Sequence, residues 1–292
     1  MAERKRRFGD RKEGRKLRSL EPMNVVSVYI MPDRVGSSNM FRDTIDITAA
    51  EKYIHKKRAE GLKGFGMLHL LAAAYTRTVS QRPGINRFIA GQKVYARNDI
   101  VMALTIKKGL QLNSDETVIK ATFEATDTAE DVYKKLSRII EVNLAEGDNS
   151  DFDGAARVLK HIPGVLLKFV VWLLKLLDYF DLLPKFLLDL SPFHGSMFIT
   201  SMGSLGIPPI FHHLYDFGNL PIFMAYGAKY SKYELNDKGE KIKKKYIDFT
   251  VNTDERICDG HYFASAFKYL KEILNDPDCL DVPPESVVED IE

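Results

Sequence analysis

Side chains that could take part in chemistry are concentrated between residues 194 and 261. One segment there, 254–260 (DERICDG), is expected to join a strand to a helix. Serine hydroxyls precede it at Ser201 and Ser204. Imidazoles, the commonest general acids and bases in enzymes, are supplied by a further group of residues: His194, His212, His213 and His261.

A zinc site would need several of these side chains together. The candidate ligands are His194, His212, His213 and Asp216. Their positions show no regular ligand spacing, so we expect no metal.

The segment 254–260 resembles a known signature. Asp254, Arg256, Asp259 and Gly260 match the D-H-R-x-x-D-G pattern of the acyltransferase catalytic domain of 2-oxo acid dehydrogenase complexes, and chloramphenicol acetyltransferases share its H-x-x-x-D-G core. The helix that follows, YFASAFKYLKEILNDP, is similar to the closing helix of that family. Two upstream stretches also resemble the family and occur in the same order: RPGIN with YARNDIVMALTIKKGL, and FITSMGSLGI at 198–207.

The resemblance covers most of the chain and implies a chloramphenicol acetyltransferase-like fold. Its class is α/β (an α+β two-layer sandwich), with a mixed sheet and packed helices. The implied activity is acyl transfer from coenzyme A, so acyl-coenzyme A is the expected co-substrate, no cofactor stays bound, and a small thiol, hydroxyl or amine is the acceptor. Family members are trimers whose active sites lie between subunits, so a homotrimer is implied. Residues 1–21 are too short to hold the family's lipoyl or subunit-binding modules.

Glu255 stands where the family has its catalytic histidine. That imidazole takes a proton from a thiol or hydroxyl, which then attacks an acyl carbonyl. Because a thiol has a pKa of ~8.5 and a free glutamate one of ~4.3, transfer to glutamate is uphill by roughly 6 kcal/mol. Glu255 is therefore a base only if it is desolvated, since burial raises a carboxyl pKa. Otherwise the chain is an inactive scaffold or binding protein that retains the fold, or a relocated base comes from His212, His213 or His261.

The resemblance implies roles for the other matched residues. The family's oxyanion donor is a serine or threonine, and here Ser201 and Ser204 compete for that role, with Thr200 behind them. The rest of the signature is expected to be structural, with an internal ion pair between Arg256 and Asp259, a turn at Gly260 and a buried thiol at Cys258.

Charge divides the chain into a body, 22–275, and two terminal segments. Residues 1–21 are expected to form a basic flexible arm, because residues 1–18 hold nine Lys and Arg against three acids. Residues 276–292 carry seven acids and no base, and are expected to form an acidic tail that could meet the arm of the same or another subunit. The arm could instead touch phosphates or an anionic membrane. The net charge of only +2 gives no case for nucleic-acid binding.

Hydrophobic periodicity predicts helices and strands that alternate along the body. Residues 22–31 read as an extended entry segment, and Thr48 is the expected N-cap of a helix over 48–60. The remaining predictions are helices at 65–81, 128–146 and 261–275, strands at 86–96, 99–107, 118–124, 196–202, 221–230 and 243–252, a loop at 147–154, and a hairpin turn at 231–242.

The most apolar stretch, 162–190, has no close counterpart in the family and is an expected helical insertion. Its charges argue against a membrane span, and Pro184 should divide it into two amphipathic helices that pack near the Ser201–Ser204 loop. Three roles stay open: extra core or trimer interface, an acyl-chain pocket or lid, or an interfacial membrane helix. The expected buried face holds Leu166, Leu167, Val170, Leu173, Leu174 and Leu177, with Lys168, Lys175 and Asp178 at its border.

Cysteine usage and the N-terminus bear on location. Cys258 and Cys279 are too few for a disulfide framework, and the basic residues at the start are followed by no apolar signal segment. The cytoplasm is therefore expected, with peripheral membrane association through 162–190 left open.

Overall fold

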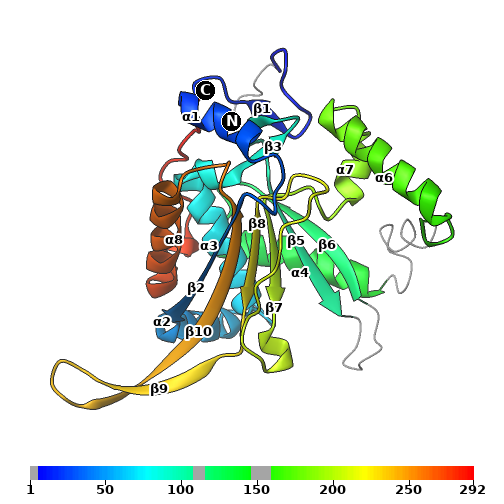
Figure 1. Ribbon diagram of the computed structural model, residues 1–292. Coiled ribbons are helices and arrows are strands. Elements are labelled where there is room, and N and C mark those ends of the chain that lie inside the picture. Colours follow the sequence, from blue (N-terminus) through cyan, green and yellow to red (C-terminus); the bar gives the residue numbers. More distant parts are fainter. Residues whose placement is uncertain (1–5, 108–115, 146–158) are drawn as a thin grey trace.

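A computed structural model describes residues 6–107, 116–145 and 159–292 (Figure 1). Its main sheet contains β2 (Ser38–Asp46), β5 (Ile100–Lys107), β6 (Glu116–Phe123), β7 (Met197–Ser201), β8 (Ile222–Tyr226), β9 (Tyr230–Leu235) and β10 (Lys241–Asp254). The strand order is β2-β10-β8-β7-β5-β6, and β9 pairs with the first part of β10. Strand β7 runs parallel to β5 and β8, whereas the other neighbours are antiparallel. The predicted α/β class with a mixed sheet is confirmed.

Four helices pack on one face of this sheet, namely α2 (Thr48–Ala59), α3 (Met67–Gln81), α4 (Ala129–Ala145) and α8 (Gly260–Asn275) (Figure 1). Helix α3 is buried along almost its whole length because α8 and α4 both pack against it. It begins where the Gly66 N–H donates to His69 Nδ1, at 3.2 Å, and it ends before Pro83, which cannot continue a helix. These helices and the sheet enclose the main hydrophobic core.

A smaller sheet of β1 (Gly14–Lys16), β4 (Lys93–Arg97) and β3 (Arg87–Ala90), in that order, lies beyond one end of the main sheet with α1 (Pro22–Ile30) beside it (Figure 1). The prediction of an extended segment over 22–31 is wrong, because the chain there is helical. Pro22 in the first turn favours a helix, since its missing N–H costs nothing at that position. This signal outweighed the strand preference of the neighbouring valines.

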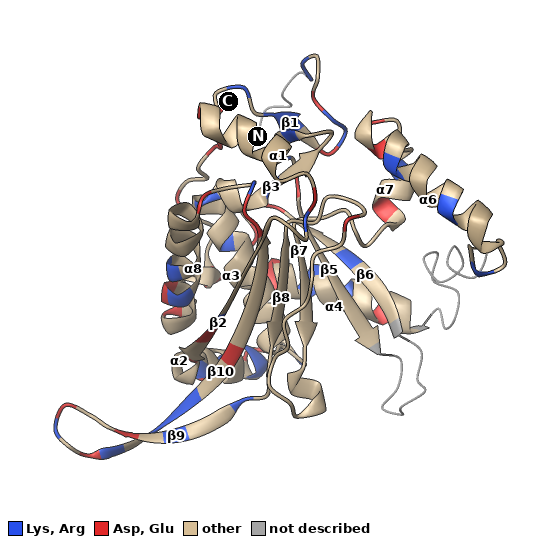
Figure 2. Ribbon diagram, viewed as in Figure 1, with Lys and Arg blue, Asp and Glu red and all other residues tan. Residues whose placement is uncertain are grey.

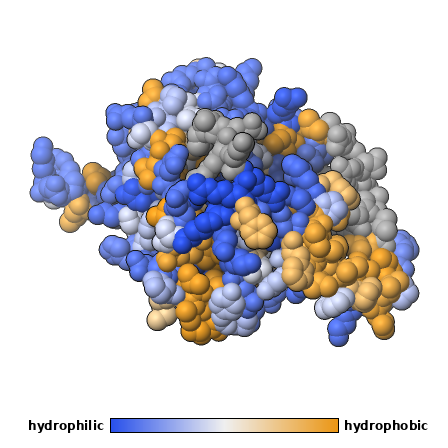
Figure 3. All heavy atoms as spheres, turned by 90° about the horizontal axis from the view of Figure 1, so that it is seen from above, coloured by the Kyte–Doolittle hydropathy of each residue, from blue (hydrophilic) through white to orange (hydrophobic). Residues whose placement is uncertain are grey.

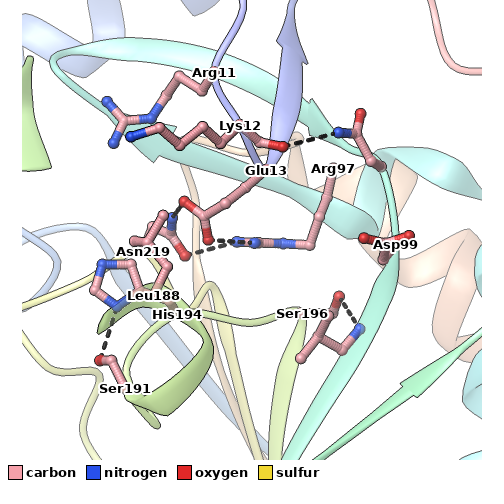
Figure 4. A network of polar contacts seen from close by, with 12 residues as sticks. Arg11, Lys12, Glu13, Arg97, Asp99, Leu188, Ser191, His194, Ser196 and Asn219 are labelled. Carbon is pink, nitrogen blue, oxygen red and sulfur yellow. Dashed lines mark hydrogen bonds and ion pairs between the residues drawn. The ribbon is translucent and has the colours of Figure 1, made fainter. Parts of the chain in front are cut away.

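The expected flexible arm is ordered in its described part. Arg11 is buried and its Nη2 donates to Asp178 Oδ1 at 2.5 Å. Figure 4 shows Glu13 joined to Arg97 and Asn219, with Arg97 donating to both at 3.2 and 2.7 Å. The arm is therefore a structural part of the body, because several of its charged side chains bind partners from distant segments. Of its basic residues, Arg4 and Lys5 lie outside the described residues.

The acidic tail meets the arm of its own chain. Leu280, in the short 3-10 turn η3 (Pro277–Asp281), is fully buried, and Asp290 binds Arg87 at 2.7 and 2.5 Å. The backbone N–H groups of Arg18 and Ser19 both donate to the Glu292 carbonyl, at 2.8 and 2.6 Å. The two terminal segments thus close one side of the molecule together.

Two local expectations also need correction. Thr48 is the first residue of α2 rather than its N-cap, and its N–H and hydroxyl both donate to Asp46 Oδ1, at 2.9 and 2.6 Å. The hairpin turn expected over 231–242 is confined to 236–240, because β9 extends to Leu235 against β10. The loop expected at 147–154 lies outside the described residues.

The apolar stretch forms two helices, α6 (Gly164–Tyr179) and α7 (Lys185–Leu190), as predicted. Its predicted buried face is right only in part, since Leu167, Val170, Leu174 and Leu177 are half-buried. Leu166 and Leu173 are exposed, whereas Asp178, expected at the border, is buried. In Figure 3 hydrophobic side chains gather on the outer surface at the side where α6 lies. No helix in the described part of the chain is long and apolar enough to span a bilayer.

The helices also do not pack near the Ser201–Ser204 loop. Asp178 and Tyr179 are bound to Arg11 and Gln92, at the end of the sheet where β7 begins. The five residues of β7 then carry the chain to the opposite end before Ser204 is reached. Closeness in sequence was therefore a poor guide to closeness in space.

Candidate active site

The signature segment leaves β10 at the end of the sheet and is held by a buried ion pair. Arg256 donates through Nε and Nη2 to the two oxygens of Asp254, at 2.8 and 2.7 Å. Its Nη1 donates to the Met31 carbonyl at 2.8 Å. Asp254 and Arg256 are both buried, so the pair is shielded from solvent.

The predicted ion pair between Arg256 and Asp259 is wrong. Asp259 is the N-cap of α8, and its Oδ1 accepts the Tyr262 N–H at 2.7 Å. A carboxylate there also favours the helix through the positive N-terminal end of the dipole. Gly260 has no positive φ, and a Cβ added to it would meet no atom within 4 Å, so the turn does not require glycine.

Glu255 points into solvent in a single chain. Its N–H donates to the Ser37 carbonyl at 2.9 Å, but its carboxylate forms no hydrogen bond or ion pair with any described residue. The desolvation that a glutamate base needs is therefore absent in one subunit.

The candidate oxyanion donors lie at the other end of the sheet. Ser201 ends β7 and is level with Tyr226 of β8, which in turn is level with Phe249 of β10. Six positions along β10 separate Phe249 from Glu255, or about 20 Å at ~3.3 Å per residue. Ser204 lies in the exposed turn η2 (Gly203–Leu205), where its Oγ donates to the Ser201 carbonyl at 3.1 Å. One chain does not bring either serine to Glu255.

The loop 207–220 runs along β10 between these two ends. Thr250 Oγ1 and Asn252 Nδ2 donate to the carbonyls of Ile210 and His212, at 2.6 and 2.8 Å. The ring of His212 stacks on Phe223, with centroids 4.3 Å apart. Burial and the nearby charge of His213 lower the pKa of His212, which favours its neutral imidazole. Its Nε2 is buried and has no hydrogen-bond partner among the described residues.

The remaining candidate histidines and the Cys258 thiol lie in different surroundings. His213 and His261 are exposed. His194 is buried between Ser191 Oγ, at 2.8 Å, and Asp178 Oδ2, at 3.4 Å. The described residues contain no cluster able to hold a metal ion. Cys258 is buried as predicted, and that burial raises the pKa of its thiol to about 12.

A cavity of about 540 Å³ lies beside the signature loop, and no sequence pattern predicted it. Its charged lining residues are Asp33, Arg34, Lys175, Asp178, Asp216 and Arg256. Burial lowers the pKa of Arg34 to about 10, although the charge of Asp254 opposes this shift. The residues that line the cavity come from α6 and several segments far apart in the sequence, so no spacing pattern could have revealed it.

The sequence matches no protein-family model and no curated protein. Among solved structures, a probable dihydrolipoamide acetyltransferase from Listeria monocytogenes is similar over 90% of this chain and 95% of its own, with a TM-score of 0.55 and 12% identity. A truncated catalytic core of the 2-oxoacid dehydrogenase multienzyme complex from Thermoplasma acidophilum gives 0.54 and 13%, over 90% and 99%. A chloramphenicol acetyltransferase gives 0.50 and 11%, over 86% and 94%.

This chain has the chloramphenicol acetyltransferase-like fold. The likeness extends over most of each chain, so the fold predicted from the signature and its flanks is confirmed.

Proposed function

We propose that this chain transfers an acyl group from a coenzyme A thioester to a thiol, hydroxyl or amine acceptor, in a site shared between the subunits of a homotrimer. A shared site is supported by the distance between the candidate base and the candidate oxyanion donors within one chain. Glu255 and Ser204 are exposed at opposite ends of one sheet, so a second copy has to bring a serine to the signature loop. The fold supports the acyltransfer chemistry. The proposed location is the cytoplasm, on the grounds of cysteine usage alone.

The chemistry needs a base, an oxyanion donor and a leaving thiolate. The base, either Glu255 or His212, takes the proton of the acceptor, whose freed electron pair attacks the thioester carbonyl. The oxyanion that forms accepts a hydrogen bond from Ser201 or Ser204. Its collapse breaks the carbon–sulfur bond and expels the coenzyme A thiolate, which receives the proton from the base. An ordinary imidazole matches a thiol more closely in pKa than an ordinary glutamate does, but burial lowers the pKa of His212 and so reduces this advantage.

A second candidate function is a binding or scaffold protein that retains the fold without catalysis. The exposed Glu255 favours it, because this carboxylate has no described partner and replaces the histidine of the signature. In that case the chain would show no acyl transfer, and replacing residues of the signature loop would change no rate.

The release of coenzyme A from acetyl-coenzyme A and longer acyl-coenzyme A, with simple thiol acceptors, tests both candidates. We expect weak acetyl transfer by the native chain, a higher rate for Glu255→His, and a rate about 100-fold lower after loss of the serine that donates to the oxyanion. Brisk native turnover that Glu255→Gln leaves unchanged would place the base elsewhere, and His212, His213 and His261 would be replaced singly. If no variant shows turnover while the assembly stays intact, the acyltransferase proposal is excluded and the scaffold or binding function remains.

A further inference from the structure

Helix α6 has two different apolar faces. Leu167, Val170, Leu174 and Leu177 are half-buried on one of them. The other face is exposed, with Val165 at 88%, Phe169 at 53% and Trp172 at 55% of their full accessible surface. The spacing of this outer face fits one side of a helix, and it is formed by Val165, Leu166, Phe169, Trp172, Leu173 and Leu176.

The helix is attached to the body at its C-terminal end, which leaves this face directed outward. Asp178 is bound to Arg11, and the Tyr179 hydroxyl donates to Gln92 Oε1 at 3.2 Å. Figure 1 shows α6 at the periphery, apart from the main sheet. Helix α6 has 16 residues with two lysines among them, and Figure 2 shows its basic positions in blue. It is therefore too short and too charged to span a bilayer but long enough to lie on one.

The charges of this segment leave an excess of positive charge beside the apolar face. Its acids are already paired, Asp178 with Arg11, Asp181 with Arg6 and Asp189 with Lys185, at 2.5, 2.7 and 2.7 Å. The exposed Lys168 and Lys175 form no ion pair with any described residue. The two lysines are seven positions apart and so lie along the same border of the outer face, on the side where Lys175 also lines the cavity. Their long stems let the ammonium groups reach a polar interface.

We propose that the outer face of α6 binds the surface of an anionic lipid bilayer, with the helix lying in the interface plane. The apolar side chains enter the boundary between head groups and acyl chains, and Lys168 and Lys175 contact the lipid phosphates. Pairing of α6 with the α6 of another copy fits less well, because it would bring the lysines together and the segment has no unpaired acid to offer them. The proposal does not depend on the acyltransferase activity.

Trp172 is the only tryptophan of the chain, so its fluorescence reports on this face directly. The full chain is mixed with phosphatidylcholine vesicles that contain or lack phosphatidylglycerol. With the anionic vesicles we expect Trp172 emission to move to shorter wavelength, quenching by iodide to fall, and the protein to sediment with the vesicles. An ionic strength of 1 M, where the Debye length is about 3 Å, should weaken the binding.

Variants separate the helix from the rest of the surface. Phe169→Asp with Leu173→Asp retains Trp172 and should reduce vesicle binding about tenfold or more, while Lys168→Glu with Lys175→Glu should remove the preference for anionic lipid. The control, Tyr233→Asp with Leu235→Asp, changes two apolar residues on β9 that are even more exposed, and it should leave binding unchanged. Circular dichroism verifies that each variant is folded.

Two results would overturn the proposal. One is an unchanged Trp172 spectrum with both kinds of vesicle. The other is a Trp172 that is shielded from iodide without lipid and becomes accessible on dilution, which would show that a second copy of the chain covers this face.

Discussion

Arg256 and Asp254 bind each other through two parallel hydrogen bonds, with Glu255 between them in the sequence. Because both side chains are buried and Glu255 itself donates its N–H to Ser37, the backbone on either side of Glu255 is fixed. The direction of the Glu255 side chain therefore depends on a pair formed within three consecutive residues.

Replacement of Arg256 by Met leaves the buried Asp254 carboxylate without its main partner. We expect the free energy of unfolding to fall by about 3–5 kcal/mol, measured by urea denaturation. Arg42→Met is the matched control, since Arg42 binds Asp248 at 2.7 Å but is 53% exposed, and it should cost less than about 1 kcal/mol. Equal losses in the two variants would show that burial does not strengthen the Arg256 pair.

Asp259→Ala removes the N-cap of α8. The expected loss is about 1 kcal/mol of unfolding free energy, because one N–H in the first turn of the helix loses its acceptor. Asp259→Asn should recover most of it, since asparagine caps equally well. A loss as large as that of Arg256→Met would mean that Asp259 belongs to the ion pair after all.

His69 should make the stability depend on pH. Its Nδ1 accepts the Gly66 N–H, and burial together with the charge of Arg58 lowers the pKa of His69 to about 4. An unfolded histidine titrates near ~6.5, so between pH 6.5 and 4 the unfolded chain binds the proton more tightly. Stability is therefore complete above pH 6.5 and falls as the pH drops, by up to about 3 kcal/mol.

Urea denaturation across this range measures the slope of stability against pH. His69→Gln should flatten it, whereas His55→Gln, at an exposed position of α2, should not. A slope that is the same in all three proteins would assign the dependence to other groups.

The shared site requires an assembly. Three chains of 33.2 kDa give a mass of about 100 kDa, which light scattering after size exclusion would detect. A stable monomer across the concentrations used for the assay would remove the shared-site mechanism, because Glu255 and the serines could then never meet.

Much of the fold could be predicted from local sequence. The strand–loop–helix around residues 254–260 and the helix over 65–81 have strong periodicity and clear breakers, and both are present. The role of Asp259 could not be predicted, because a carboxylate at that position serves either as a cap or as an ion-pair partner, and only the backbone geometry decides between them. The α1 helix was missed because its valines and isoleucine favour strands locally, whereas the start at Pro22 decides the outcome.

The candidate site was harder to predict than the fold. The motifs that contain Ser201 and Glu255 were expected to form one site. In a single chain, however, Ser201 is about 20 Å from Glu255 along the sheet, at ~3.3 Å per residue. The neighbours of the signature loop, Arg34 and Asp216, come from segments far apart in the sequence. Hydrophobicity identified α6 as a helix but could not tell which side of it would face the body, since both sides are apolar.

The contact between the N-terminal arm and the acidic tail, which we call the clasp, joins Arg15, Arg18 and Ser19 to the last two residues of the chain. This contact has a consequence for the order of folding. Arg15 donates to the Ile291 carbonyl, 276 positions away, and closing so long a loop in an unstructured chain costs about 5 kcal/mol. The clasp can form only after β3, β4 and α3 have already brought these segments together. We therefore expect it to assemble late and to open before the core does, so the N–H groups of Arg18 and Ser19 should exchange with solvent while the core is still protected.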